Sequence, residues 1–167
     1  MKKIFALLLI LTLTFTNGIA VLAEQLDIPP ADQISSNPNY SSYTWIASTN
    51  MGGQAGTNTV GQDGLQIVMA QASISKSGSS ITASGETVTN IISDDLGGTI
   101  CIQRWKNNKW NNYYSHFFLD FDRSSISFSD TVTVESGYYY RVVVSHYANT
   151  VYSTVTANSV TQSVYIN

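Results

Sequence analysis

The chain has 167 residues with 8 Lys and Arg against 11 Asp and Glu, a net charge of −3, and one cysteine. Nucleic acid is excluded as a partner, because its binding rests on neutralising phosphates with Lys and Arg. The single cysteine, Cys101, excludes an internal disulfide, and we expect it to be a small buried hydrophobe rather than a nucleophile.

The first 23 residues have the pattern of a secretory signal peptide. Lys2 and Lys3 precede an apolar run from Ile4 to Phe15, and small neutral residues follow up to Ala23. The apolar run is about 12 residues long, too short for a bilayer, which needs about 20. We therefore predict cleavage after Ala23, secretion to the extracellular medium, and no membrane span after cleavage.

The rest of the chain is predicted to be one β-domain behind a short lead. Residues 24–40 contain all three prolines and few apolar residues, which is typical of a flexible N-terminal lead. In residues 41–167, alternating runs rich in Val, Thr and Tyr are separated by Ser, Asn and Gly, and no window shows helical periodicity. This pattern predicts an all-β fold, an immunoglobulin-like antiparallel β-sandwich of about seven to nine strands.

The expected strands are short and regularly spaced. In chain order they cover residues 41–49, 65–75, 80–93, 99–105, 110–120, 125–134 and 138–147, with a final pair within 151–166. A glycine-rich loop is expected over 50–64, and a turn is expected at 93–98 because of its Asp and Gly residues.

The segment SGYYYRVVVSHY, residues 136–147, predicts a corner of the fold. Alternation places Tyr140, Val142 and Val144 on the inward face and Tyr139 on the opposite face. Gly137 turns the chain just before this strand. The arrangement is typical of a tyrosine corner, in which the phenol packs at the sheet edge and its hydroxyl bonds to nearby backbone.

The hairpin CIQRWKNNKWNNYY is the candidate recognition surface. A two-residue turn at Asn107 and Asn108 places Trp105 directly across from Trp110. Strict alternation then predicts one shared outer face for Cys101, Gln103, Trp105, Trp110, Asn112, Tyr114 and His116. The candidate ligand-binding residues are Trp105, Trp110, Tyr114 and Gln103, since paired aromatic rings stack on sugars while amides orient them. An alternative stays open, in which Trp105 turns inward or the pair only braces the hairpin.

Neither catalytic residues nor metal ligands nor cofactors are predicted. Asp120 and Asp122 lack the spacing of a calcium-binding loop, and the G-x-S-x-G pattern of a nucleophile elbow is absent. The favoured function is a secreted, non-catalytic binding module for a cell-surface glycan or protein. Two alternatives stay open: an antagonistic, bacteriocin-like polypeptide, and a small secreted hydrolase that uses His116 or His146.

Two motifs in residues 99–167 carry a family resemblance. The pattern IQRW followed by Trp110, together with GYYYRV further on, resembles a functionally uncharacterised family of small secreted proteins of Gram-positive bacteria. The resemblance implies a signal peptide and a single β-domain. It implies no ligand and no catalytic residue.

Overall fold

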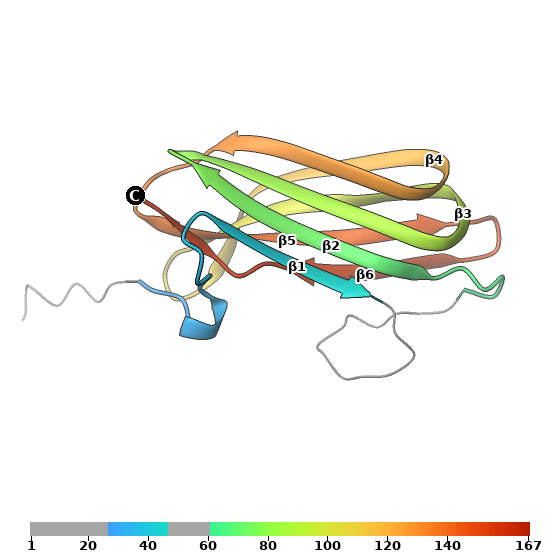
Figure 1. Cartoon of the computed structure of the whole chain (residues 1–167), viewed down its shortest axis with the longest axis horizontal. Helices are drawn as coiled ribbons and strands as arrows, with labels where there is room; N and C mark the ends of the chain where they lie inside the picture. Colours follow the sequence, from blue (N-terminus) through green and yellow to red (C-terminus); the bar gives the residue numbers. More distant parts are fainter. Residues whose placement is uncertain (1–26, 47–60) are drawn as a thin grey trace, which may run out of the picture.

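The computed structural model describes residues 27–46 and 61–167 (Figure 1). These residues form one 3-10 turn and seven strands: η1 (Ala31–Gln33), β1 (Tyr40–Ile46), β2 (Ile67–Ser77), β3 (Ser80–Trp105), β4 (Trp110–Thr133), β5 (Tyr138–Asn149), β6 (Thr154–Val160) and β7 (Val164–Ile166). The predicted signal peptide, the first residues of the lead and most of the glycine-rich loop lie outside the described residues.

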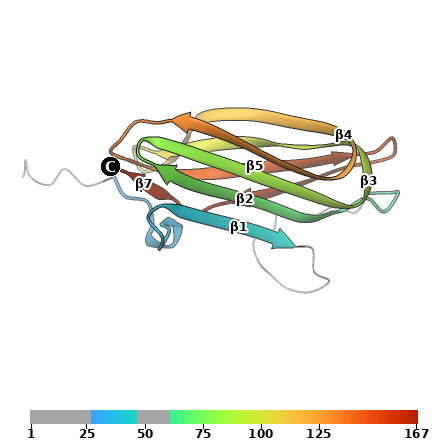
Figure 2. The same ribbon diagram turned by 45° about the horizontal axis from the view of Figure 1, so that its top comes forward.

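The strands form one antiparallel sheet that curls into two layers. The order is β1-β2-β3-β5-β6, with β4 beside β3 and β7 beside β5. The first half of β3 pairs with β2 and the end of β4, whereas its second half pairs with the start of β4 and with β5. Between the halves the pairing breaks, from Val88 to Ser93, and the strand bends back (Figures 1 and 2). The predicted all-β sandwich is confirmed, with two layers that share their longest strands.

The predicted turn at residues 93–98 is wrong, because this segment is the continuous middle of β3. Its residues pair with β4 on one side and with β5 on the other. The glycines serve close packing here: a Cβ on Gly97 would lie 2.1 Å from the carbonyl oxygen of Phe118, and one on Gly98 would lie 2.7 Å from the ring of Phe128. The expected strands 80–93 and 99–105 are therefore one strand, as are 110–120 and 125–134.

The core lies between the two layers and follows the predicted alternation of β5. Tyr140, Val142 and Val144 are fully buried, as the sequence predicts. Around them pack further side chains from β2, β3, β4 and β7, among them Ile74, Ile81, Ile100, Ile102, Phe128 and Ile166. Each large apolar side chain buried in this way contributes about 1.5–3 kcal/mol of transfer free energy.

The predicted tyrosine corner is also confirmed. The hydroxyl of Tyr140 donates a hydrogen bond of 2.9 Å to the carbonyl oxygen of Glu135. Gly137 has a φ of +85°, a conformation that favours glycine, and lies between the two residues. Burial of the phenol raises the pKa of Tyr140 to about 12. The hydroxyl therefore stays protonated and keeps its role as a donor.

The N-terminal lead contacts the sandwich from Asp27 onward. The amide of Ser35 donates to the carbonyl of Ser163 at 2.8 Å, and the amide of Ser163 donates to the carbonyl of Gln33. The carboxylate of Asp27 accepts hydrogen bonds from the backbone amides of the turn between β3 and β4. The lead thus crosses the end of the sheet that carries the two tryptophans. Among the described residues, no helix combines the length and apolarity that a membrane crossing requires.

Candidate functional site

The tryptophan hairpin has the predicted turn and register. Asn107 and Asn108 have φ values of 58° and 56°, which is the type of turn that Asn tolerates and that suits the twist of a hairpin. Trp105 and Trp110 lie opposite each other, with ring centroids 5.2 Å apart in an edge-on arrangement. The expected two-residue turn and the opposition of the two rings are confirmed.

Both tryptophans are occupied by contacts within the chain. Trp105 is only 9% exposed. The indole nitrogen of Trp110 donates to Oε1 of Gln33 at 2.8 Å, and the guanidinium of Arg141 lies 4.4 Å from its ring centroid. This geometry fits the alternative in which the pair braces the hairpin and holds the lead, because little ring surface remains for a ligand.

Gln103 belongs to the same brace. Its amide nitrogen donates to Oδ1 of Asn112 at 2.9 Å, and its Oε1 accepts a hydrogen bond from Nε of Arg141 at 2.9 Å. Both polar ends of the Gln103 side chain are therefore engaged beside the tryptophans. Of the four predicted ligand-binding residues, the structure brings Trp105, Trp110 and Gln103 together.

Tyr114 does not join them, because a β-bulge lies in between. The register moves from Gln103 opposite Asn112 to Ile102 opposite Tyr114, so that Tyr113 is an extra residue on β4. Such an insertion reverses the faces of every residue that follows. The prediction that Tyr114 and His116 share a face with the tryptophans is wrong: they lie on the face of Ile102, toward the core.

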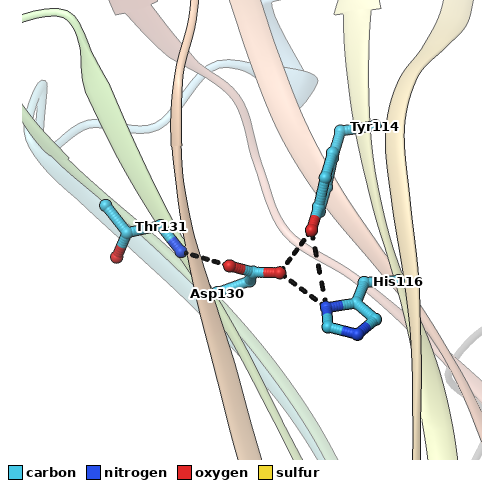
Figure 3. A network of polar contacts seen from close by, with 4 residues as sticks. All are labelled: Tyr114, His116, Asp130 and Thr131. Carbon is cyan, nitrogen blue, oxygen red and sulfur yellow. Dashed lines mark hydrogen bonds and ion pairs between the residues drawn. The ribbon is translucent and has the colours of Figure 1, made fainter.

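Tyr114 and His116 instead bind a carboxylate from the other layer (Figure 3). The hydroxyl of Tyr114 and Nδ1 of His116 both contact Oδ2 of Asp130, the latter at 2.7 Å, while Oδ1 accepts from the amide of Thr131. The hydrogen bonds from Tyr114 and then His116 lower the pKa of Asp130, and the carboxylate in turn raises the pKa of Tyr114. This contact joins the two halves of β4 across the edge of the sandwich.

The geometry gives the hydrolase alternative little support. Asp130 orients His116 as a carboxylate orients a general base, but within the described residues no side chain hydrogen-bonds to Nε2, where a nucleophile would be activated. His146 is buried. Burial raises the pKa of the Cys101 thiol, which is partly buried, and this is the opposite of the shift that activates a cysteine.

The bulge has a second effect: it places an apolar row on the outer face of β4. Phe117, Leu119 and Phe121 are 53%, 39% and 58% exposed. The first two form one wall of a groove of about 500 Å³ on the outside of the layer that consists of the start of β4, the second half of β3, β5 and β6. The groove is lined by Asp95, Thr99, Phe117, Leu119, Ser145, His146, Tyr147, Thr156 and Asn158.

The strand register places apolar side chains along one wall of this groove and polar side chains along the other. One row across the sheet runs Phe117, Thr99, Ser145 and Asn158, and the next runs Leu119, Gly97, Tyr147 and Thr156. Gly97 itself is buried, and its missing side chain makes room for the backbone of Phe118. Burial and the nearby Asp95 raise the pKa of Tyr147, so its hydroxyl is a donor at neutral pH. An apolar ring edge thus faces hydroxyl and amide groups.

A second hollow, of about 350 Å³, lies on the outer face of the other layer, which consists of β1, β2, the first half of β3 and the end of β4. Its lining consists mostly of small polar side chains: Gln71, Ser73, Ser84, Glu86, Ser127 and Ser129, with Gly85 and Phe128 below. Phe128 is only 7% exposed, so this hollow offers no aromatic surface for stacking. The groove beside Phe117 is the better candidate site, since binding sites combine apolar walls with a few polar groups.

Sequence reasoning missed Phe117 and Leu119 because both alternation patterns in HFFLDF contain aromatic rings. In one pattern His116 and Phe118 face outward, and in the other Phe117 and Leu119 do. Only the bulge at Tyr113 decides between them. The bulge lies within residues 111–114, two Asn followed by two Tyr, and this run gives no distinct sequence signal for an extra residue.

No family model matches this chain, and no curated protein or solved structure matches it either.

Proposed function

We propose that this protein is a secreted, non-catalytic binding module that holds a hydroxyl-rich ligand, such as a cell-surface glycan, in the groove beside Phe117. A single observation carries the proposal: one groove has the exposed Phe117 and Leu119 on one side and Asn158 and Thr156 on the other. Secretion rests on the predicted signal peptide.

The groove suits a sugar in both size and chemistry. Its volume of about 500 Å³ falls within the range of about 300–1,000 Å³ found for small-molecule sites. The apolar C–H face of a pyranose packs on an aromatic ring, while hydroxyl and amide groups opposite can bind its hydroxyls. Asp95 is the charged side chain in the lining, which favours neutral or amino sugars over acidic ones.

The test is binding of the mature chain to arrays of cell-wall fragments and glycans, followed by titration calorimetry with each ligand found. Phe117→Ala and Asn158→Ala should each weaken binding at least tenfold, because few contacts carry most of the binding energy. Tyr40→Ala is the matched control, since Tyr40 is a 43% exposed aromatic residue outside the groove. It should bind like the wild type.

Two results would contradict this proposal. One is a full array without any ligand. The other is a ligand whose affinity is unchanged in Phe117→Ala but lost in Trp110→Ala, which would return the site to the tryptophan hairpin. Urea unfolding of each variant checks that a loss of binding is not a loss of folding.

A further inference from the structure

One end of the groove beside Phe117 carries a carboxylate whose charge is not neutralised. Asp95 is the charged side chain of the lining and is partly exposed. None of the ion pairs among the described residues includes Asp95, whereas Asp120 on the neighbouring strand pairs with Arg123. A ligand in the groove therefore lies beside an unpaired negative charge.

The neighbouring strands hold this carboxylate in a fixed position. The amide nitrogen of Asn149 on β5 donates to Oδ2 of Asp95 at 3.1 Å. The amide oxygen of Asn149 accepts a hydrogen bond from the hydroxyl of Thr154 on β6 at 2.8 Å, so the Asn149 side chain is itself oriented. In the part of the chain that the structure describes, no other donor bonds to Asp95, which leaves Oδ1 for a ligand. The carboxylate is thus a preorganised acceptor.

Apolar and aromatic groups shield this carboxylate partly from water. Phe121 on β4 lies opposite Asp95, and Leu119 lies in the next row of the sheet. On the other side, Tyr147 of β5 is in that same next row. Burial and the charge of Asp95 both raise the pKa of Tyr147, so the phenol and the carboxylate interact. An opposite charge binds more strongly in such a place than on an open surface, because less water screens it.

We propose that the groove selects sugars that carry a free amine, and that Asp95 binds the ammonium group. This inference rests on the proposed function and narrows its ligand from hydroxyl-rich glycans to amino sugars without an acetyl group. The ammonium donates to Oδ1 of Asp95, a hydrogen bond between charged groups, which is stronger than one between neutral groups. An N-acetyl group is neutral and gains no such bond.

The length of the groove further requires an oligosaccharide. Thr99 lies opposite Phe117, and Asp95 lies four residues before Thr99 on the same strand. At about 3.3 Å per residue, the two positions are about 13 Å apart, which exceeds the size of one pyranose ring. At least two linked units are therefore needed: one packs its C–H face on Phe117, and the next crosses Leu119 and brings its amine to Asp95.

A divalent cation is a poorer occupant of this end of the groove. Calcium takes six to eight oxygen ligands, and the lining supplies a single carboxylate. The described residues also hold no group of three His, Cys, Asp or Glu side chains that could bind a metal ion. A monovalent organic cation with an apolar body fits the lining better, since Leu119 and Phe117 continue from Asp95 along one wall.

The test compares two matched probes by titration calorimetry with the mature chain. They are a tetramer of glucosamine with free amines and the same tetramer after N-acetylation of every amine. The wild type should bind the amine form at least about tenfold more tightly, as expected for one hydrogen bond between charged groups. Raising the pH until the amines are neutral should remove this preference. Phe117→Ala should weaken the binding of both forms, because both contact the ring.

Asp95→Asn is the decisive variant. The change keeps an oxygen that can accept from Asn149 and removes the charge, so the preference for the amine form should be lost. Asp94→Asn is the matched control, because it removes an equal charge from an exposed neighbour outside the groove. It should keep the preference of the wild type. Urea unfolding of both variants checks that they fold.

The outcomes separate this inference from the proposed function. A wild type that binds glycans on the array without preferring the amine tetramer overturns the inference and leaves the proposed function in place. An array without any ligand overturns both. An equal loss of preference in Asp94→Asn and Asp95→Asn overturns the contact with Asp95. Tighter binding of a lysine oligopeptide than of the amine tetramer, lost in Asp95→Asn, would assign the groove to a protein ligand instead.

Discussion

Acidification should destabilise the protein through one buried histidine, His146. Its Nδ1 lies 2.8 Å from the hydroxyl of Thr87, and its Nε2 lies 2.7 Å from the hydroxyl of Ser159. The Thr87 hydroxyl also donates to the carbonyl of Gly97, so its single hydrogen is used there and Nδ1 must be the protonated nitrogen. Nε2 then accepts from Ser159, and a second proton on His146 would reverse that hydrogen bond and place a positive charge in the core.

The magnitude follows from the pKa. Burial lowers the pKa of His146 from 6.5 to about 4. The unfolded chain therefore takes up a proton before the folded chain does, and stability falls as the pH drops from about 6.5 to about 4. A difference of about 2.5 pKa units corresponds to a loss of about 3 kcal/mol over this window. Asp63, with a pKa of about 2, and Asp130, whose pKa is also lowered, lose their contributions at lower pH.

Urea unfolding at several pH values between 7 and 4.5 measures this loss as a falling midpoint at constant slope. His146→Gln keeps a polar side chain that does not titrate, so the midpoint of this variant should change much less over the same window. His116→Gln is the matched control, because it removes the other histidine and should leave the dependence of the wild type in place. A wild-type midpoint that stays constant from pH 7 to 4.5, or the same fall in His146→Gln, would refute the reasoning.

Three further predictions concern the corner, the hairpin and export. Tyr140→Phe should cost about 1–3 kcal/mol in urea unfolding, because it leaves the carbonyl of Glu135 without its donor, whereas Tyr139→Phe should cost little; equal costs would contradict the assignment. Trp105→Ala should cost about 3–5 kcal/mol, as expected for emptying a buried aromatic site, and its intrinsic fluorescence should confirm a shielded ring in the wild type. Mass spectrometry of culture medium should find a chain that begins at Glu24, and recovery of uncleaved protein from membranes alone would contradict export.

Local patterns predicted those parts of the fold that depend on neighbouring residues. The inward alternation of Tyr140 and Val142, the turn at Asn107 and the opposition of the tryptophans all follow from the period of a strand and the backbone preferences of Asn and Gly. These features need no knowledge of the other layer. The structure confirms these features because they depend only on residues close in the sequence.

The parts that were missed depend on contacts between distant segments. Gly97 and Gly98 look like a turn in the sequence, but Phe118 and Phe128 pack where their side chains would be. The extra residue at Tyr113 is stabilised by packing on Tyr140, with ring centroids 5.6 Å apart, and that contact is invisible to alternation. One such residue exchanged the predicted and the observed outer faces of β4, and with them the candidate site.

The long hairpin of β3 and β4 also bears on how the protein folds. Its ladder extends from Trp105 opposite Trp110, next to a two-residue turn, to Ser80 opposite Thr133 at the far end of the other layer. Pairing can therefore begin with a very short loop and propagate residue by residue up to the bend at Ser93, which keeps the entropy of each step small, and it resumes at Val88 in the other layer. Because the same two strands supply both layers, the layers stay joined by continuous chain across the bend from Val88 to Ser93, and we expect them to open together. We expect the backbone amides of both halves of β3 to exchange with solvent at one common slow rate, through opening of the whole domain.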